Sequence, residues 1–542
     1  METALEYEPY VYPEGCAFNT LEDIRGKKIT VMGLGLNGGG EACVRFFLRH
    51  GAFVTITDMK TSEQLAPTIK RLNSDPDLDK DRFTYVLGEH RIEDFADADC
   101  VIKNPGVKIQ GNKYLAAAKR IESDISIFLH FTKAPIIAVT GSKGKSSTVS
   151  ALDFSLRNAG FKSFLGGNIT VSPLTFLERT DGTTPVVLEL SSWQLADLRG
   201  RKALKPKIAI ITKIMPDHQN WYGSMESYVN DKKLIYADQG PEDYTILDFD
   251  EDDYLKDCRS PEPGCKCWGD VFAKETRGTV LRYSKFQLPK DVFGAYQAKE
   301  DRSTVGYIQL PGNSEGRKVM GQLQVPGEHM KTNVLNAALA LSLMNVAPEQ
   351  ILSIVGIWKG ITHRLERFHE WQSPESGIKV SFYNDSCATV PEAAAAASQA
   401  FARKVILLTG GTDKNLNFEP LAKVLRGEGG AEAKYQPLQT YLLAGSGTDK
   451  LLARLADPKQ CLGPFESLEI MLGVLKANLQ NPSADRIYKF YPDDDPIPVV
   501  FSPGATSFGM FSNEFDRGNK FKDAVKQIFS DDKVELPLDV KS

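Results

Sequence analysis

The stretch that most constrains the fold of this chain runs from residue 134 to residue 160 and reads APIIAVTGSKGKSSTVSALDFSLRNAG. It begins with a short apolar, β-branched run, passes through a glycine-rich turn, and ends in a segment whose apolar residues recur at helical spacing. Backbone N–H groups at a helix start favour phosphate, because the helix dipole is positive there. The stretch therefore predicts a strand, a phosphate-binding loop and a helix.

The residues of this loop suit phosphate chemistry. Lys145 offers a mobile positive charge, and Ser146 and Ser147 offer hydroxyls that can bind a magnesium ion held between phosphates. The usual phosphate-loop pattern begins with a glycine where this chain has Val139, and the first glycine here is Gly141. The loop is thus a shortened variant, and a turn without function is the alternative.

The length and charge of the chain limit its class. A chain of 542 residues predicts three or four domains at about 150 residues each. The net charge of −5 gives no overall field that would attract nucleic acid or an anionic membrane. The N-terminus lacks the basic and apolar regions of a secretory signal, and no apolar run approaches the roughly 20 residues of a membrane helix. We expect a cytoplasmic protein with small-molecule partners, without nucleic acid or membrane.

The cysteines predict reduced thiols. Eight cysteines in a chain of this length are too few for a disulfide scaffold. Cys258, Cys265 and Cys267 form a cluster, for which a zinc-binding knot is the alternative. Because a lone C-x-C without a nearby histidine is a weak metal signal, we favour ordinary thiols.

A second glycine-rich loop lies near the start of the chain. The predicted strand KITVM is followed by Gly33, Gly35 and Gly38 in G-x-G-x-x-G spacing, and Asp58 ends the next predicted strand, 25 residues after Gly33. The glycines let the backbone approach a diphosphate, and the acid can bind a ribose hydroxyl. A nicotinamide dinucleotide fits this pattern, but so does any other ligand with a diphosphate and a ribose. The motif predicts the shape of the ligand and leaves its chemistry open.

Polar residues repeatedly follow apolar strands beyond the phosphate loop. Asn168 follows FLGG, Glu189 ends PVVLE, and Asp217 and His218 follow IAIIT. Ligands of open α/β sheets bind at the carboxyl edge of the strands, so we expect these residues at one site. A carboxylate at Glu189 is costly to bury unless it is paired or bound to a metal. A salt-bridged core glutamate and a structural histidine are the alternatives.

An ordered set of motifs resembles a known family. GSKGKSS, GGN, ELSSWQL, an Asp-His pair, Y-x-x-x-K, HRLE, NDS-x-AT, GGTDK and SPGATSF follow one another in this order. The set resembles the Mur ligase family, from about residue 28 to about residue 529. The resemblance implies an α/β protein of three domains: an N-terminal Rossmann-like domain at residues 1–133, a central P-loop ATPase-like domain with a parallel sheet and a small β-rich extension at residues 134–362, and a C-terminal Rossmann-like domain at residues 363–542.

The resemblance also implies an activity. It is closest to family members that use ATP and Mg²⁺ to add D-glutamate to UDP-N-acetylmuramoyl-L-alanine through an acyl phosphate, as cytoplasmic monomers in peptidoglycan precursor synthesis. A ligase of the same fold that adds another amino acid, such as L-glutamate, is the alternative within the family. A nicotinamide-binding module fused to an ATPase and a nucleotide-binding regulator without catalysis are the alternatives outside it.

Roles for individual residues follow from the resemblance, motif by motif. The implied catalytic residues are Lys145, Glu189, His218 and Lys232. The implied metal-binding residues are Ser147, Glu189, His218 and Lys232, the last as a carbamate. The implied ATP-binding residues are Gly141, Ser142, Lys143, Gly144, Lys145, Ser146, Ser147, Asn333, Arg364 and Asp385. The residues implied for the UDP-linked substrate are Gly35, Leu36, Asn37, Asp58, Lys60, Asn104, Pro105, Gly106, Asn168 and Ser191. Those implied for the amino acid are Thr389, Lys414, Ser507 and Phe508.

The chain departs from the family pattern at several positions. Cys387 stands where the family usually has lysine, which removes a positive charge near the reaction centre or the amino-acid carboxylate. Lys213 and Met330 each stand where the family usually has asparagine. Glu514 and Phe515 stand in the reverse of the expected order, on the side of the pocket that would select glutamate. These departures therefore leave open which amino acid the protein would add.

Overall fold

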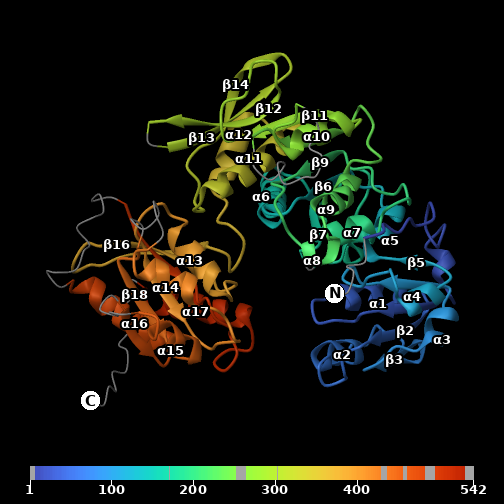
Figure 1. Ribbon diagram of the computed structural model, residues 1–542, viewed down its shortest axis with the longest axis horizontal. Coiled ribbons are helices and arrows are strands. Elements are labelled where there is room, and N and C mark those ends of the chain that lie inside the picture. Colours follow the sequence, from blue (N-terminus) through green and yellow to red (C-terminus); the bar gives the residue numbers. More distant parts are fainter. Residues whose placement is uncertain are drawn as a thin grey trace. The chain divides into compact units, whose positions relative to one another are not determined.

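The computed structural model describes residues 7–169, 171–251, 264–301, 303–428, 436–455, 461–482 and 495–530, and Figure 1 shows its elements. The chain divides into two compact units. The first unit comprises Met1–Gln322 and Lys331–Gly356, and the second comprises Leu323–Met330 and Ile357–Ser542. Two of the three main sheets belong to the first unit and one to the second.

The first sheet has five parallel strands in the order β3-β2-β1-β4-β5. Its strands are β1 (Lys28–Met32), β2 (Phe53–Asp58), β3 (Phe83–Leu87), β4 (Cys100–Lys103) and β5 (Ile121–Glu122). Its helices are α1 (Gly39–Arg49), α2 (Ala66–Asn73), α3 (Ile92–Ala96), α4 (Lys113–Ala117) and α5 (Asp124–Phe131). The strand order reverses direction between β1 and β4, and ligands of open α/β sheets bind at such a point.

The second sheet has nine strands in the order β14-β13-β12-β11-β10-β9-β6-β8-β7. They are β6 (Ile136–Thr140), β7 (Phe164–Gly167), β8 (Val186–Glu189), β9 (Ile208–Ile211), β10 (Tyr244–Asp248), β11 (Thr279–Ser284), β12 (Gly294–Glu300), β13 (Ser303–Leu310) and β14 (Asn313–Met320). The accompanying helices are α6 (Lys145–Asn158), α7 (Ser192–Ala196), α8 (Gln219–Tyr222), α9 (Met225–Lys232), α10 (Trp268–Glu275), α11 (Glu328–Leu343) and α12 (Pro348–Gly356).

The expected β-rich extension joins this same sheet. The predicted strand TVLRYS is β11, which pairs in parallel with β10, whereas β13 pairs antiparallel with both of its neighbours, β12 and β14. Strand β6 lies between β8 and β9. The loop after β6 is therefore flanked by the carboxyl ends of both strands.

The third sheet has six strands in the order β15-β16-β20-β17-β18-β19, of which β15 is antiparallel. The strands are β15 (Glu366–Gln372), β16 (Lys379–Asn384), β17 (Ile406–Gly410), β18 (Gln439–Leu443), β19 (Cys461–Phe465) and β20 (Ile497–Phe501). The helices are α13 (Pro391–Gln399), α14 (Glu419–Leu425), α15 (Ser446–Leu452), α16 (Leu468–Gln480) and α17 (Glu514–Ile528).

Alternate residues of these strands build two apolar layers. Val499 of β20 packs in a cluster with residues of α16 and α17, whereas Val500 packs in a second cluster with residues of α13 and α14. Successive side chains of a strand point to opposite faces, so one continuous apolar run supplies both layers. The third domain is thus a sheet covered by helices on both faces.

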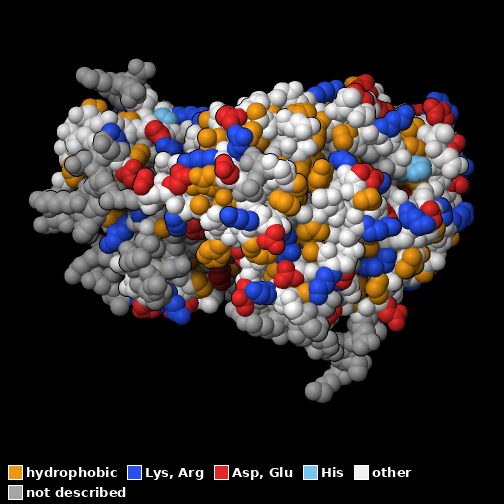
Figure 2. Space-filling model, turned by 90° about the horizontal axis from the view of Figure 1, so that it is seen from above, with side chains coloured by type: hydrophobic (Ala, Val, Ile, Leu, Met, Phe, Trp, Pro, Cys, Tyr) orange, Lys and Arg blue, Asp and Glu red, His pale blue; other side chains and the backbone are white. Residues whose placement is uncertain are grey.

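The surface carries both signs of charge. On the face shown in Figure 2, Lys and Arg side chains are interspersed with Asp and Glu side chains. Among the described residues, none of the helices combines the length and the apolar character that crossing a bilayer requires.

Candidate active site

In the first unit, β6, the turn at residues 141–144 and α6 are the strand, the loop and the helix that the sequence predicted. Gly141 and Gly144 have φ angles of 139° and 97°, which L side chains rarely adopt. A Cβ at Gly144 would lie 2.4 Å from Oδ1 of Asn333, a predicted ATP-binding residue on α11. The turn therefore requires glycine, and Asn333 packs directly against it.

Two lysines converge on the carbonyl oxygen of Gly141. Lys145 Nζ donates to this oxygen at 2.8 Å, and Lys232 Nζ donates to it at 2.9 Å. Lys232 is 1% exposed, and its Nζ lies 4.5 Å from the ring centroid of Tyr228. Burial, reinforced by the charge of Lys145, holds the pKa of Lys232 well below its usual value, and burial lowers the pKa of Lys145 as well. Lys232 is thus prepared to lose its proton, as reaction with carbon dioxide requires.

The neighbouring Lys233 differs sharply from Lys232. It follows α9 directly, and its Nζ forms an ion pair with Glu275 at 2.6 Å. Both partners of this pair are partly exposed. Two adjacent lysines therefore have different environments, and only Lys232 contacts the phosphate loop through a hydrogen bond.

Glu189 is buried at the end of β8 with one oxygen unused. Its Oε1 accepts a hydrogen bond from Asn168 Nδ2 at 2.9 Å, whereas its Oε2 accepts none from any described residue. The backbone N–H of Asn168 also donates to the Glu189 carbonyl at 2.8 Å, so the ends of β7 and β8 are tied together. A buried carboxylate oxygen without a donor is costly unless a cation binds it. This arrangement suits a metal ligand.

His218 is more open than the other predicted metal ligands. It precedes α8 with φ at 51°, and its side chain is 42% exposed. Its Nε2 lies 3.9 Å from Asp217 Oδ1, and its ring centroid lies 4.9 Å from that of Trp193. Within the part of the chain that the structure describes, no group of three or more His, Cys, Asp or Glu side chains forms a metal site. The predicted metal-binding set contains only two residues of these types, Glu189 and His218, together with Ser147 and a carbamate on Lys232. It therefore stays a prediction.

The cysteine cluster lies partly outside the described residues. Cys258 falls among the residues that the structure does not describe. Cys267 is a buried thiol that donates to the Asp248 carbonyl at 3.4 Å.

A pocket of about 160 Å³ opens where the first sheet reverses strand order. Residues of the loops after β1 and β4 line this pocket. Residues that follow β7 line it as well, and so does one residue of α7. Four predicted residues for the UDP-linked substrate line it: Asn37, Asn104, Pro105 and Asn168. The other predicted ones lie outside its lining: Gly35, Leu36, Asp58, Lys60, Gly106 and Ser191.

Two of the predicted residues outside the lining, Asp58 and Ser191, hold the segments that line the pocket. Asp58 Oδ2 accepts from the Gly35 N–H at 3.0 Å and Oδ1 accepts from the Lys60 N–H at 2.9 Å, so this carboxylate fixes the glycine loop. Ser191 caps α7 and accepts from the Gln194 N–H at 3.2 Å. Gln194 lines the pocket, and the sequence analysis missed it. The S-x-x-Q capping box was the signal that could have placed it at the start of a helix.

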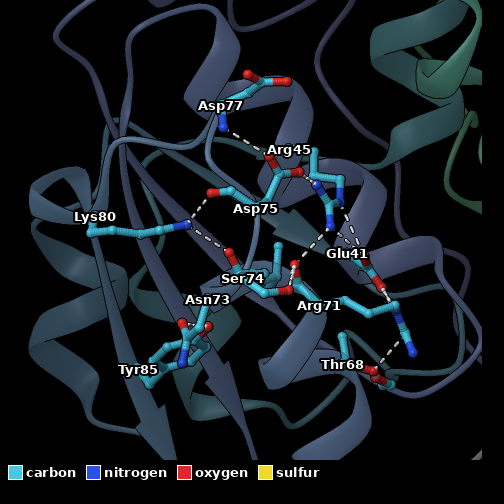
Figure 3. Close-up of polar contacts among 12 residues, drawn as sticks. Glu41, Arg45, Thr68, Arg71, Asn73, Ser74, Asp75, Asp77, Lys80 and Tyr85 are labelled. Atoms are coloured by element: carbon cyan, nitrogen blue, oxygen red, sulfur yellow. Dashed lines mark hydrogen bonds and ion pairs between the residues drawn. The ribbon is translucent and has the colours of Figure 1, made fainter.

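A polar network buttresses the glycine loop of the first sheet (Figure 3). Thr68 Oγ1 donates to the Gly35 carbonyl at 3.1 Å, and Arg71 Nη2 donates to Thr68 Oγ1 at 3.1 Å. Arg71 Nε also donates to Glu41 Oε2 at 2.8 Å, while Arg45 Nε donates to Glu41 Oε1 at 3.0 Å. Helices α1 and α2 are thereby tied to each other and to the loop. The sequence analysis missed this network, although Glu41 and Arg45 have the spacing of a helical ion pair.

Three loops meet at the carboxyl edge of the third sheet. Thr412 and Thr506 form an antiparallel bridge between the loops after β17 and β20. The Gly504 N–H donates to the Ala388 carbonyl at 2.9 Å, which joins the loop after β20 to the loop after β16. The four predicted amino-acid-binding residues lie on these joined loops: Thr389, Lys414, Ser507 and Phe508. Ser507 is buried, whereas Phe508 is 68% exposed.

Asp385 and Arg364, both predicted to bind ATP, belong to this second unit. Asp385 Oδ1 accepts from the Leu365 N–H at 3.1 Å, and Oδ2 accepts from Ser502 Oγ at 2.7 Å. Burial nevertheless raises the pKa of Asp385 to about 7. Burial also raises the pKa of the Cys387 thiol, an effect that the nearby Arg364 charge opposes. Asp385 therefore holds the start of this domain in place.

Comparisons with known proteins cover most of the chain. The model described as Mur ligase MurD-like, N-terminal domain, matches residues 27–126, and the Mur ligase middle domain matches residues 139–341. The UDP-N-acetylmuramoylalanine--D-glutamate ligase of Treponema pallidum is 41% identical over 93% of this chain and 98% of its own length. The enzyme of the same name from Borreliella afzelii is 36% identical over 94% and 99%.

Solved structures share the fold. The UDP-N-acetylmuramate-alanine ligase MurC of Thermotoga maritima has a TM-score of 0.51 at 17% identity and covers 92% of this chain and 99% of its own. MurF of Acinetobacter baumannii has a TM-score of 0.52 at 14% identity and covers 94% and 92%. The middle-domain model spans the loop at residues 141–144, and both full-length relatives are more than 30% identical to this chain. The chain therefore belongs to the Mur ligase family.

Proposed function

We propose that this protein is an ATP-dependent ligase that joins D-glutamate to UDP-N-acetylmuramoyl-L-alanine in peptidoglycan precursor synthesis. Relatives named for this reaction match nearly the whole chain at 36–41% identity. The observation that carries the proposal is the convergence of Lys145 and the buried Lys232 on the Gly141 carbonyl of the phosphate loop. Lys145 would supply positive charge where a nucleotide phosphate meets a second anion, and Lys232, as a carbamate, would help to hold a metal ion there.

The proposed reaction has two covalent steps. The carboxylate of the muramoyl-alanine attacks the γ-phosphorus of ATP, which gives an acyl phosphate and ADP. The amine of glutamate then attacks the acyl carbon, and the tetrahedral intermediate expels phosphate and loses a proton. Positioning and the neutralisation of crowded negative charge are the main requirements. Lys145 would bind the β- and γ-phosphates beside the N–H groups at the start of α6.

The residues present also fit magnesium. Ser147 would hold one Mg²⁺ ion, and Glu189 with His218 would hold a second, with a carbamate on Lys232 as an anionic partner. The hydroxyl, carboxylate and carbamate supply the hard oxygen atoms that this cation prefers. The unused, buried Oε2 of Glu189 supports this assignment. When bound, the two ions would supply positive charge between the phosphate and the carboxylate. Residues of the chain hold their ligands in place, as Asn168 does for Glu189.

We place the UDP-linked substrate at the pocket lined by Asn37, Asn104, Pro105 and Asn168. Asp58 and Lys60 would complete it through the glycine loop that Asp58 fixes. The joined loops of the third sheet would bind the amino acid. We further propose that the protein acts as a monomer in the cytoplasm.

A ligase for a different amino acid, such as L-glutamate, is the second candidate. The observation that favours it is Cys387, which lacks the charge of the lysine that is usual in the family. The mechanism would be unchanged, because the phosphate loop and Lys232 do not depend on the identity of the amino acid.

The deciding experiment is phosphate release from ATP with magnesium and UDP-N-acetylmuramoyl-L-alanine. D-glutamate, L-glutamate, L-lysine and no amino acid are compared. We expect release that depends on D-glutamate. Release with another amino acid alone would support the second candidate, and no release with any would contradict both.

A further inference from the structure

Arg517 lies in the first turn of α17 and is one of the largest fully buried side chains of the described residues, at 1% exposure. Its guanidinium donates three hydrogen bonds. Nε donates to Ser386 Oγ at 3.0 Å, Nη2 donates to the Ser386 carbonyl at 2.7 Å, and Nη1 donates to the Ala505 carbonyl at 2.9 Å. One side chain thus binds the loop after β16 and the loop after β20 at once.

The partners of this guanidinium are all neutral. Among the described residues, no carboxylate forms an ion pair with Arg517, although burying a charge is costly without one. Burial lowers the pKa of Arg517 to about 10, so the group is still charged at neutral pH. Lysine lacks the rigid fork that places three donors on two loops. The geometry of the fork therefore explains why arginine occupies this buried position.

The two loops are those that carry predicted amino-acid-binding residues. Ser386 precedes Thr389 on the first loop, and Ala505 precedes Ser507 on the second. Ser386 Oγ also donates to the Glu514 carbonyl at 2.7 Å, which closes a ring between the first loop and the start of α17. A change at Arg517 would alter the spacing of both loops together.

We infer that Arg517 is a positioning residue of the amino-acid pocket, which sets the spacing between Thr389 and Ser507. The inference rests on the proposed function, because that function places the amino acid at these loops. Arg517 acts through the loops and does not itself contact the substrate. Its loss should therefore weaken amino-acid binding and leave the binding of the UDP-linked substrate, which is placed at the first sheet, unchanged.

The test compares Arg517→Lys, which keeps a charge but loses the fork, with Ser386→Ala, which removes only the hydroxyl. Lys520→Ala is the matched control, because Lys520 lies on the same helix, is about half exposed and pairs with Asp516 at 3.0 Å. We expect KM for D-glutamate to rise about tenfold in Arg517→Lys and about threefold in Ser386→Ala. KM for the UDP-linked substrate should stay within about twofold of the wild type. Lys520→Ala should match the wild type throughout.

Hydrogen exchange of residues 386–389 and 504–508 gives a readout that does not depend on catalysis. We expect faster exchange in both loops of Arg517→Lys and wild-type exchange in Lys520→Ala. A lower kcat with unchanged KM for D-glutamate, or unchanged exchange, would overturn the inference. If Arg517→Lys does not fold, Ser386→Ala decides by the same two criteria. Wild-type protein without D-glutamate-dependent phosphate release would contradict the proposed function, while the exchange result would still decide whether Arg517 holds the loops.

Discussion

Basic side chains lie at the carboxyl edges of both the second and the third sheet, but their chemistry differs. At the second sheet, Lys145 and Lys232 donate to one carbonyl oxygen, and burial lowers the pKa of both amines. At the third sheet, the Arg517 guanidinium is held by three neutral acceptors and is still charged at neutral pH. A lysine can lose its proton and react, whereas an arginine cannot. The difference is consistent with the proposal that the chemistry occurs at the edge of the second sheet and that the third sheet binds the amino acid.

The largest effect should come from replacing Lys232. Lys232→Arg keeps a positive charge but removes the amine that can become neutral, and Lys232→Ala removes both. We expect either change to lower kcat by about 10³-fold in the phosphate-release assay. Lys233→Ala should retain activity, because Lys233 pairs with Glu275 and makes no hydrogen bond to the loop. An active Lys232→Arg variant would show that a neutral amine is not required.

The next largest effect should come from replacing Glu189, whose Oε2 accepts no hydrogen bond among the described residues. Glu189→Gln replaces a carboxylate oxygen by an amide that binds cations poorly, and we expect about 100-fold lower activity with a higher magnesium requirement. The melting temperature should stay the same or rise, because the buried Oε2, which accepts no hydrogen bond among the described residues, is removed from a carboxylate. Glu275→Gln serves as the control. A magnesium titration curve identical to that of the wild type would exclude Glu189 as a metal ligand.

The third effect is a pH dependence of stability in the second unit. The pKa of Asp385 is about 7 in the folded chain against the usual 3.8, so between these values the folded state binds a proton that the unfolded state has lost. The free energy of unfolding should therefore fall as pH rises from 5 to 7, by about 2 kcal/mol. Asp385→Asn should remove this slope in denaturant titrations, whereas Asp516→Asn, at a partly exposed carboxylate of α17, should keep it. Equal slopes in wild type and Asp385→Asn would contradict the buried, protonated state.

Local patterns predicted the strands, the loops and the family. Helix α6 begins at Lys145 as the sequence indicated, and the three-domain α/β fold and the family are confirmed by the sheets and the relatives. The domain boundaries and the assignment of individual site residues are still predictions. Residues 323–330 cluster with the second unit, which sequence position alone could not indicate.

The sequence patterns did not predict contacts between distant segments of the chain. Asp58 has the spacing of a ribose-binding acid, yet both of its oxygens accept backbone N–H groups of the chain itself. Pairing of this kind depends on how loops pack, and motif spacing does not encode it. Arg517 did leave a signal, because Phe521, Val525 and Ile528 recur at helical spacing on the apolar face of α17 and Arg517 shares that face.

The smallest expected effect comes from adding a lysine at the carboxyl edge of the third sheet, where Arg517 is buried. Cys387→Lys restores the residue usual in the family, one position from Ser386 and close to the Arg364 charge. If the amino-acid carboxylate lies nearby, KM for the amino acid should fall about threefold, because a charge-assisted hydrogen bond is gained while repulsion from Arg364 offsets part of it. Cys461→Lys, at a partly buried cysteine of β19, is the control for a lysine introduced elsewhere in this unit. An unchanged KM would place Cys387 outside the pocket, and recognition would then depend on the loops that Arg517 holds.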